Sequence, residues 1–191
     1  GSINLIQRGI VTGTHKTLNP GKAVFTSLHG SNKSEIEFTI DNPAIELQHS
    51  DVVVNAVNIA KHDKMIARNN AISIDLTGQI NAESVFGGRQ ISGTGGQLDF
   101  QIGAITSKGG RAITLLWSTA LNGSVSRIVP QLEHGSIITV PRTFADTVIT
   151  EYGIACLLGK SIRDRAQELI NIAHPDFRSD LTNVAKRLFY P

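Results

Sequence analysis

The sequence predicts a single α/β domain with an open sheet covered by helices. Short apolar runs are interleaved with helical patterns along all 191 residues, and this alternation is typical of a sheet that helices cover on at least one face. Hydrophobic residues make up 40% and charged residues 18% of the chain, an ordinary globular composition that can form one substantial core. No repeat or low-complexity segment interrupts the pattern.

The first third of the chain mixes both element types. Residues 3–9 resemble the last turns of a helix that stops at Gly9. Residues 34–41 have helix-like content and end at Asn42-Pro43, because a residue before proline avoids the helical conformation. We expect strands at residues 23–28, 45–48 and 52–54, and a short helix at 57–61.

The middle of the chain is richer in strands. Residues 71–76 alternate apolar and polar side chains, which predicts a strand with one covered face. Residues 77–79 form a turn, so that 80–82 pair back as a hairpin. Glycine loops follow at 87–88 and 93–96, and a helix is expected from Gly96 to about Ala104. Further strands are expected at 111–117, 125–128, 137–140 and 147–150.

Two helices are predicted at the C-terminal end. Ser161 followed by Asp164 is a capping-box arrangement. Apolar side chains then recur on one helical face, at Ile162, Ala166, Leu169, Ile170 and Ala173. Pro175 is expected to end that helix, and a second stripe consists of Leu181, Val184, Ala185 and Leu188.

Charge and cysteine content exclude several classes of protein. A formal net charge of +2 is too balanced for a nucleic-acid partner. Cys156 is the only cysteine, so no intrachain disulfide can form, which fits a reducing, cytoplasmic location. Because Cys156 lies in an apolar run, we expect a buried structural thiol. Trp117 and Phe100 are expected in the core.

No membrane or metal pattern emerges from the sequence. No apolar run approaches the roughly 20 residues that span a bilayer, and no signal-peptide pattern is present. Residues 1–2 resemble a cloning remnant, and we expect the natural protein to continue upstream of Ile3. His174 is expected to cap helix carbonyls. The histidines are scattered without a ligand pattern, at His15, His29, His49, His62, His134 and His174.

A glycine cluster is the strongest local signal for chemistry. Gly93, Gly95 and Gly96 precede the predicted helix, and glycines there let backbone N–H groups approach a ligand closely. A thioester carbonyl that becomes an oxyanion needs such fixed donors. The alternative is a tight turn that binds nothing. The dinucleotide fingerprint is excluded, because its third glycine is missing.

Several motifs in order over nearly the whole chain carry a specific resemblance. They are Asp75-Leu76-Thr77-Gly78-Gln79, Asn81-Ala82-Glu83-Ser84, the loop with Gly93 to Phe100, Ser126-Arg127-Ile128-Val129-Pro130, Thr150-Glu151-Tyr152-Gly153 and Ala173-His174-Pro175-Asp176-Phe177-Arg178. With them, residues 3–191 resemble the C-terminal domain of the acetyl-CoA hydrolase/transferase family, near its 4-hydroxybutyrate and butyrate:acetate CoA-transferases.

The resemblance implies one half of a two-domain enzyme of CoA-transferase (NagB/RpiA-like) type. Acyl-CoA would lie between the halves. A glutamate would attack the thioester, giving an acyl-glutamyl anhydride and then a glutamyl-CoA thioester that a second carboxylate resolves. CoA and acyl-CoA would be substrates, with no permanently bound cofactor. The expected partners are the N-terminal half and further copies of the protein, with no nucleic acid or membrane.

The nucleophile itself is not expected in this chain. In the family it lies in a Gly-x-His-Ser/Thr-Glu segment upstream of the glycine that matches Gly9, so the isolated chain is predicted to be inactive. Asp75, Glu83 and Glu151 are expected to be structural carboxylates with local partners.

Other roles follow from the same resemblance. Gly95 matches a glycine whose backbone N–H contributes to the oxyanion hole. Asn55 is a second candidate donor, although a gapless register places Val54 at the family's asparagine; the alternative is a plain loop asparagine. Lys108 and Arg127 could replace a lysine that relatives carry near Asn122, or could be solvated surface charges. The predicted CoA-binding residues are Gly93, Gly95, Gly96, Gln97, Lys108 and Asn122.

Three functions remain open from the sequence. The first is half of a CoA-transferase that supplies oxyanion donors and part of the CoA cleft. The second is an acyl-CoA hydrolase, in which water replaces the acceptor carboxylate. The third is a non-catalytic ligand-binding or scaffold domain.

Overall fold

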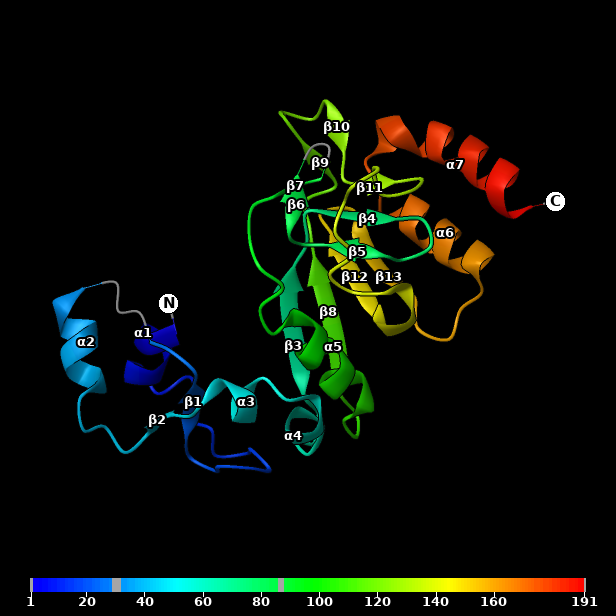
Figure 1. The fold of residues 1–191 in the computed structure, drawn as a ribbon. Helices are drawn as coiled ribbons and strands as arrows, with labels where there is room; N and C mark the ends of the chain where they lie inside the picture. The colour runs from blue at the N-terminus through cyan, green and yellow to red at the C-terminus, as the bar shows by residue number, and fades with distance from the viewer. Residues whose placement is uncertain (1, 29–31, 86–87, 191) are drawn as a thin grey trace.

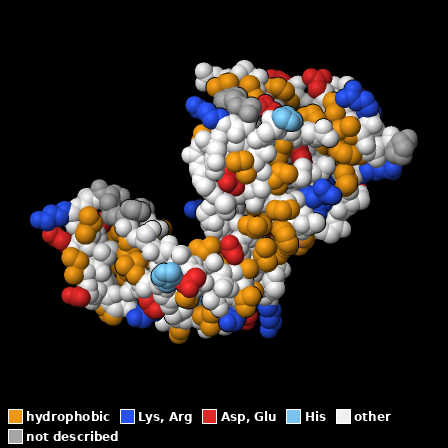
Figure 2. All heavy atoms as spheres, viewed as in Figure 1, with side chains coloured by type: hydrophobic (Ala, Val, Ile, Leu, Met, Phe, Trp, Pro, Cys, Tyr) orange, Lys and Arg blue, Asp and Glu red, His pale blue; other side chains and the backbone are white. Residues whose placement is uncertain are grey.

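The computed structural model describes residues 2–28, 32–85 and 88–190. His29 and Gly87 lie outside these ranges. A small N-terminal lobe is set at an angle to a larger body (Figure 1). Figure 2 shows the notch between them, with hydrophobic side chains reaching the surface on both sides of the bend.

The N-terminal lobe consists of two helices and two parallel strands. Helix α1 (Ser2–Gln7) leads into Gly9, which has a φ of +66°. Strand β1 (Ala23–Phe25) pairs with β2 (Ile45–Leu47), and α2 (Lys33–Thr39) connects them. The Asn32 side chain caps α2 by accepting from the Glu35 amide at 2.9 Å. The predicted helices are confirmed, whereas the first strand ends three residues early, at Phe25.

Two short helices link the lobe to the body. Helix α4 (Ala56–Ala60) confirms the predicted short helix. The strand predicted at residues 52–54 is wrong, because Ser50–Val53 form helix α3. A short apolar run cannot distinguish strand from helix by periodicity, and Asp51 in the first turn favours a helix start.

The body is built on a four-stranded sheet in the order β13-β12-β8-β3. Strands β3 (Ile66–Asn70), β8 (Arg111–Leu115) and β12 (Thr147–Thr150) are parallel, and β13 (Gly153–Cys156) pairs antiparallel with β12. Helix α5 (Gln97–Thr106) packs on β8, where Gln101 Nε2 donates to Thr114 Oγ1 at 3.0 Å. The predicted α/β class with an open sheet is therefore confirmed.

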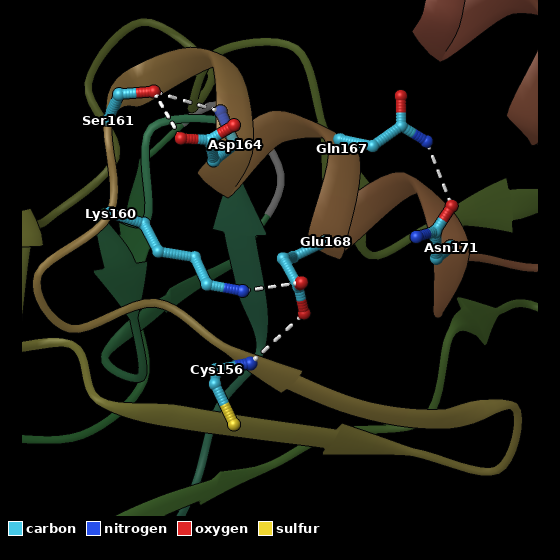
Figure 3. Close-up of polar contacts among 7 residues, drawn as sticks. All are labelled: Cys156, Lys160, Ser161, Asp164, Gln167, Glu168 and Asn171. Carbon is cyan, nitrogen blue, oxygen red and sulfur yellow. Dashed lines mark hydrogen bonds and ion pairs between the residues drawn. The ribbon is translucent and has the colours of Figure 1, made fainter.

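Two of these strands were not predicted, and one consequence concerns Cys156. Strand β3 is largely polar, and β13 follows β12 after a two-residue turn, so neither gives a clear sequence signal. Along β13, Ala155 points into the core and Cys156 to the surface. In Figure 3 the Cys156 sulfur points away from α6 (Ile162–Asn171). The predicted burial of this thiol is therefore wrong.

A three-stranded sheet, β11-β4-β5, carries the predicted hairpin. Strand β4 (Ser73–Asp75) pairs antiparallel with β5 (Ile80–Asn81) and parallel with β11 (Ile128–Val129). The buried Asp75 carboxylate accepts hydrogen bonds from Thr77 and Gln79, two from each, so its predicted structural role is confirmed. The strand predicted at residues 137–140 is wrong: Val140 makes only an isolated bridge to Ile80.

Shorter elements complete the body. Strands β6 (Ser84–Val85) and β7 (Arg89–Gln90) form one antiparallel pair, and β9 (Thr119–Ala120) and β10 (Val125–Ser126) form another. A 3-10 turn, η1 (Arg142–Phe144), precedes β12.

The C-terminal helices complete the main core. Ser161 caps α6 by accepting from the Asp164 amide, as predicted. Helix α6 ends at Asn171, and Pro175 is the first residue of α7 (Pro175–Phe189). His174 therefore caps an N-terminus, accepting from the Asp176 amide, and the predicted carbonyl-capping role is wrong. The buried stripe consists of Ala166, Leu169, Ile170, Ala173, Leu181 and Ala185.

Three side chains that were predicted in the core are exposed, and a fourth is only partly buried. Trp117 is 69% exposed, because it follows β8 beyond the end of the sheet. Ile162 and Leu188 are also exposed, at the margins of their helices. Phe100 is partly buried against a small cluster formed by Ala67, Ala104 and Ala112.

Candidate functional site

Helices α4 and α5 lie side by side and run in the same direction. At their starts, a Cβ atom built on Gly96 would lie 2.9 Å from Val54 Cγ1. Near their middles, a Cβ atom on Gly103 would lie 2.5 Å from Ile59 Cβ. At their ends, Ser107 Oγ donates to the His62 carbonyl. The two N-termini therefore meet beside the glycine loop.

The glycine loop presents backbone donors that the rest of the described structure does not use. Within residues 2–28, 32–85 and 88–190, no hydrogen bond has the amide of Gly93, Gly95 or Gly96 as its donor. Gly96 is the N-cap residue of α5, and Gly95 has a φ of +55°. A Cβ atom on Gly93 or Gly95 would meet nothing within 4 Å. The loop can therefore offer N–H groups, next to a helix N-terminus, to a negatively charged atom.

Gln97, the first residue of α5, lies deeper than the sequence suggested. Its side chain is 7% exposed, and Nε2 has no hydrogen-bond partner among the described residues. Buried polar atoms are rarely left without a partner. This donor is therefore available to a ligand or a water at the base of the loop.

Asn55 lies next to the glycine loop, but its side chain caps helix α4. Asn55 Oδ1 caps α4 by accepting from the amides of Val57 and Asn58, at 3.0 and 3.2 Å. This capping role is structural, and the role of Asn55 as an oxyanion donor stays a prediction. Its neighbour Val54 touches Gly96, so both predicted oxyanion segments adjoin in space.

Lys108 lies at the wrong end of α5 for a contact with the glycine loop. Its carbonyl accepts from the Lys64 amide at 2.8 Å, just before β3 begins. Ten helical residues separate this turn from the loop, a length of roughly 15 Å. A contact between Lys108 and CoA stays a prediction, and it would involve a part of CoA away from the glycine loop.

Asn122 and Arg127 lie on and near the β9–β10 hairpin. Asn122 and Leu121 have φ values of +55° and +48° in the exposed turn, a conformation that asparagine tolerates better than most residues. The Arg127 Nε is buried and has no partner among the described residues. Among the described residues, no hydrogen bond joins either side chain to the glycine loop.

Glu83 and Glu151 both lie close to strand ends. Glu83 is 4% exposed, and its carbonyl accepts from the Ile91 and Ser92 amides, which fixes the segment leading into the glycine loop. Glu151 accepts from the Ser118 amide and hydroxyl at 2.9 and 2.6 Å, as expected for a locally paired carboxylate. Burial alone would raise the pKa of Glu151, but these hydrogen bonds and nearby His174 lower it below 4.5.

Replacing Glu151 by glutamine should change how the free energy of unfolding depends on pH, because the Glu151 carboxylate is hydrogen-bonded to Ser118. A depressed folded-state pKa means that the carboxylate stabilises the fold above its unfolded pKa near 4.5, and that this contribution disappears as pH falls through the lower folded value. Urea unfolding should therefore show Glu151→Gln less stable than the parent at pH 7, with the gap closing toward pH 3. A gap independent of pH would contradict the assignment.

A groove with a volume of about 830 Å³ runs beside α4, between the N-terminal lobe and the body. Val24 of β1, Ile66 of β3, and Ile59 and Phe100 line it. Lys16 and His62 also line it. Burial lowers the pKa of Lys16, and the nearby Glu46 carboxylate only partly offsets this effect. Burial also lowers the pKa of His62, and the positive charge of Lys16 lowers it further. Sequence analysis missed this groove, because its walls come from segments far apart in the chain.

The described residues contain no group of three or more histidine, cysteine, aspartate or glutamate side chains arranged to hold a metal ion. Within the same part of the chain, no helix combines the length and apolar character needed to cross a bilayer.

Comparison with known proteins gives a consistent set of relatives. Residues 32–185 match the model of the acetyl-CoA hydrolase/transferase C-terminal domain. The 4-hydroxybutyrate coenzyme A transferase of Clostridium kluyveri is 47% identical over 99% of this chain and 44% of its own length. The acetyl-CoA hydrolase of Kluyveromyces lactis is 33% identical over 72% of this chain and 26% of its own length.

Solved structures agree with these relatives. RipA from Yersinia pestis is 43% identical with a TM-score of 0.90, covering 97% of this chain and 41% of that protein. The 4-hydroxybutyrate CoA-transferase from Porphyromonas gingivalis is 39% identical with a TM-score of 0.82, covering 98% and 43%. The chain thus spans less than half the length of these relatives.

Proposed function

Because the chain belongs to the acetyl-CoA hydrolase/transferase family, we propose that it is the C-terminal half of a CoA-transferase. That enzyme moves CoA from an acyl-CoA to a small carboxylate through a glutamyl-CoA thioester. The N-terminal half and the nucleophilic glutamate belong to the segment upstream, and the enzyme is a cytoplasmic homo-oligomer. CoA enters as a substrate and not as a resident cofactor.

The availability of the glycine-loop amides carries this proposal. A turn that only connected a strand to a helix could satisfy its amides internally, whereas those of Gly93, Gly95 and Gly96 have no acceptor among the described residues. When the upstream glutamate attacks the thioester carbon, the carbonyl oxygen gains negative charge, and the Gly95 amide donates to it. The resulting tetrahedral species then expels CoA thiolate and leaves the acyl-glutamyl anhydride.

The remaining proposed contacts with substrate come from residues at the glycine loop and, for Asn122, from the resemblance to the family. Gly93 and Gly96 shape the loop, and Gln97 Nε2 is a buried donor at its base. Asn55 contributes from the adjoining start of α4, where its Oδ1 is engaged as a cap and its Nδ2 is the group that could donate. Asn122 contacts CoA farther from the thioester. Lys108 is not part of the loop site.

A hydrolase is the second candidate, because the similarity extends to named acetyl-CoA hydrolases. The two reactions differ only in whether water or a carboxylate resolves the glutamyl-CoA thioester. The relatives with the higher identities are named CoA transferases, which favours transfer.

An assay of the full-length protein and of the 191-residue chain tests the proposal. With butyryl-CoA and acetate, the full-length protein should form acetyl-CoA in an acetate-dependent manner, with little free CoA. The chain alone should show only background, since its nucleophile is upstream. Release of free CoA at the same rate with or without acetate would indicate the hydrolase. No turnover by the full-length protein would favour the non-catalytic alternative, and turnover by the chain alone would contradict the upstream nucleophile.

A further inference from the structure

Helix α5 carries two glutamines on the face that it buries against the sheet. Gln97, Gln101 and Ala104 are four and three residues apart, a spacing that places them on one side of the helix. Gln97 is 7% exposed, and Gln101 and Ala104 are fully buried. Gln97 also follows Gly96 directly, so this buried face begins at the glycine loop.

The inner glutamine is bonded to the sheet. Gln101 Nε2 donates to Thr114 Oγ1 of β8 at 3.0 Å, and the Thr114 side chain is almost fully buried. The surroundings are apolar, since Ala104 and Ala112 lie in the same small cluster. Apolar side chains of similar shape can replace both partners of a buried hydrogen bond at nearly neutral cost. The stability of the fold therefore does not require a polar pair at this position.

Each glutamine has one fully buried atom that lacks a hydrogen-bond partner among the described residues. These atoms are Gln97 Nε2, which is a donor, and Gln101 Oε1, which is an acceptor. Side chains four residues apart on a helix are neighbours, with Cβ atoms about 5–6 Å apart. Buried polar atoms are rarely left without a partner, and one small group between these two atoms would satisfy both.

We propose that an internal water bridges Gln97 Nε2 and Gln101 Oε1, and that Gln101 and Thr114 are positioning residues for the glycine loop. The water accepts from Gln97 and donates to Gln101. A water bonded to both atoms spans about 4.5–5 Å between them, which suits side chains one helical turn apart. The chain of Thr114, Gln101, water and Gln97 then connects strand β8 to the residue after Gly96.

The burial of Gln97 Nε2 favours water over substrate as its direct partner. The described chain itself encloses this atom, so a group as large as a thioester has no access to it, whereas a water needs room only for itself. Water also offers a lone pair to one atom and a hydrogen to the other. An anion would suit only the Gln97 donor, and a cation would suit only the Gln101 acceptor. Gln97 Nε2 therefore acts on the substrate site indirectly.

A fixed Gln97 would hold the start of α5 and the loop before it. Gln97 is the first residue of the helix, and Gly96 is its N-cap. Glycine has wide conformational freedom, so a loop with Gly93, Gly95 and Gly96 needs a rigid neighbour to keep its amides aimed at one point. A misplacement of about 1 Å can lower a reaction rate about 100-fold. The expected effect on turnover rests on the proposed function, whereas the water itself does not.

Crystal structures of the full-length protein, at a resolution that places single waters, test the bridge. Without substrate, one water should lie within hydrogen-bonding distance of both Gln97 Nε2 and Gln101 Oε1. In Gln101→Leu this water should be lost, and the Gln97 side chain should change rotamer. A parent structure in which Gln97 Nε2 bonds to any group other than a water would overturn the bridge.

Turnover of the same full-length variants tests the positioning role. Gln101→Leu should lower kcat by about 10- to 100-fold and change the KM for acyl-CoA little. Thr114→Val should also lower kcat, and Thr114→Ser, which keeps the hydroxyl, should restore most of it. The double variant Gln101→Leu/Thr114→Val should be more stable than either single variant, because neither partner is left unpaired. Its kcat should nevertheless stay as low as that of Gln101→Leu.

Ser107→Ala is the matched control for loss of a buried hydroxyl from the same region. Ser107 follows the far end of α5 and is 6% exposed, and its hydroxyl bonds to the His62 carbonyl and the Met65 amide. This variant should lose stability and keep the parent kcat.

Three results would overturn parts of the proposal. A kcat that recovers together with stability in the double variant, or that falls equally in Ser107→Ala, would reduce the polar chain to a packing role. Absence of turnover in the parent would overturn the proposed function and the positioning role together. The density between Gln97 and Gln101 would still confirm or exclude the water in that case.

Discussion

Replacing Gly95 by valine in the full-length enzyme should lower acyl-CoA turnover by about 100- to 1000-fold, the usual cost of losing one oxyanion donor. Gly95 has a φ of +55°, a backbone conformation that a β-branched residue strongly disfavours. The valine side chain itself would have room, since a Cβ atom there meets nothing within 4 Å. The loop should therefore turn its amide away from the thioester while the fold persists.

Gly159→Val is the matched control for backbone strain. Gly159 has a φ of +76° in the turn before α6, and its Cβ position is also empty within 4 Å. Both variants should lower the free energy of unfolding by a similar amount, about 1–3 kcal/mol, but only Gly95→Val should reduce kcat. If kcat falls equally in both variants, the loss is due to lower stability. If kcat of Gly95→Val is unchanged, Gly95 is not part of the site.

Replacing Gly103 by alanine should destabilise the chain, although alanine ordinarily stabilises a helix interior by about 1 kcal/mol relative to glycine. The new Cβ would lie 2.5 Å from both Ile59 Cβ and Cγ2, and 3.0 Å from the Ala56 carbonyl oxygen. Helices α4 and α5 would have to separate, and we expect a loss of about 1–3 kcal/mol as for other overpacked sites. Urea unfolding followed by circular dichroism measures this difference.

Two further variants identify the contact responsible. Gly93→Ala adds the same methyl group in the glycine loop, where nothing lies within 4 Å, and should leave the unfolding midpoint almost unchanged. The double variant Ile59→Ala/Gly103→Ala should lose less stability than the sum of the single changes, because the Cγ2 contact is gone. A stabilised Gly103→Ala would contradict close packing of α4 on α5. Strict additivity would instead assign the clash to the Cβ atom of residue 59 and the Ala56 carbonyl, which both remain in Ile59→Ala.

Separation of α4 from α5 would also affect the candidate site. The same pair of helices brings Val54 against Gly96 and places Asn55 beside the glycine loop. In the full-length enzyme, Gly103→Ala should therefore reduce turnover at temperatures where the protein remains folded. Gly103 thus links packing in the middle of α5 to the position of the donors at its start.

The sequence alone was enough to predict the family and several local elements, although it missed strands β3 and β13. Ser161 and Asp164 define the start of α6, and the stripe from Ala166 to Ala173 predicts its buried face, because caps and helical periodicity depend on residues that are neighbours in the chain. The turn at Thr77 to Gln79 was predictable for the same reason. The ordered motifs were sufficient to identify the family, which the comparisons confirmed.

The tertiary structure alone decided which of these elements share a site. It placed Val54, the neighbour of Asn55, against Gly96, and it placed Lys108 beside Lys64 at the opposite end of α5. It also exposed Cys156 and Trp117 and left β1 and β3 with open edges. These outcomes depend on contacts between residues far apart in the chain, and no local periodicity encodes which distant segment supplies the other side of a contact.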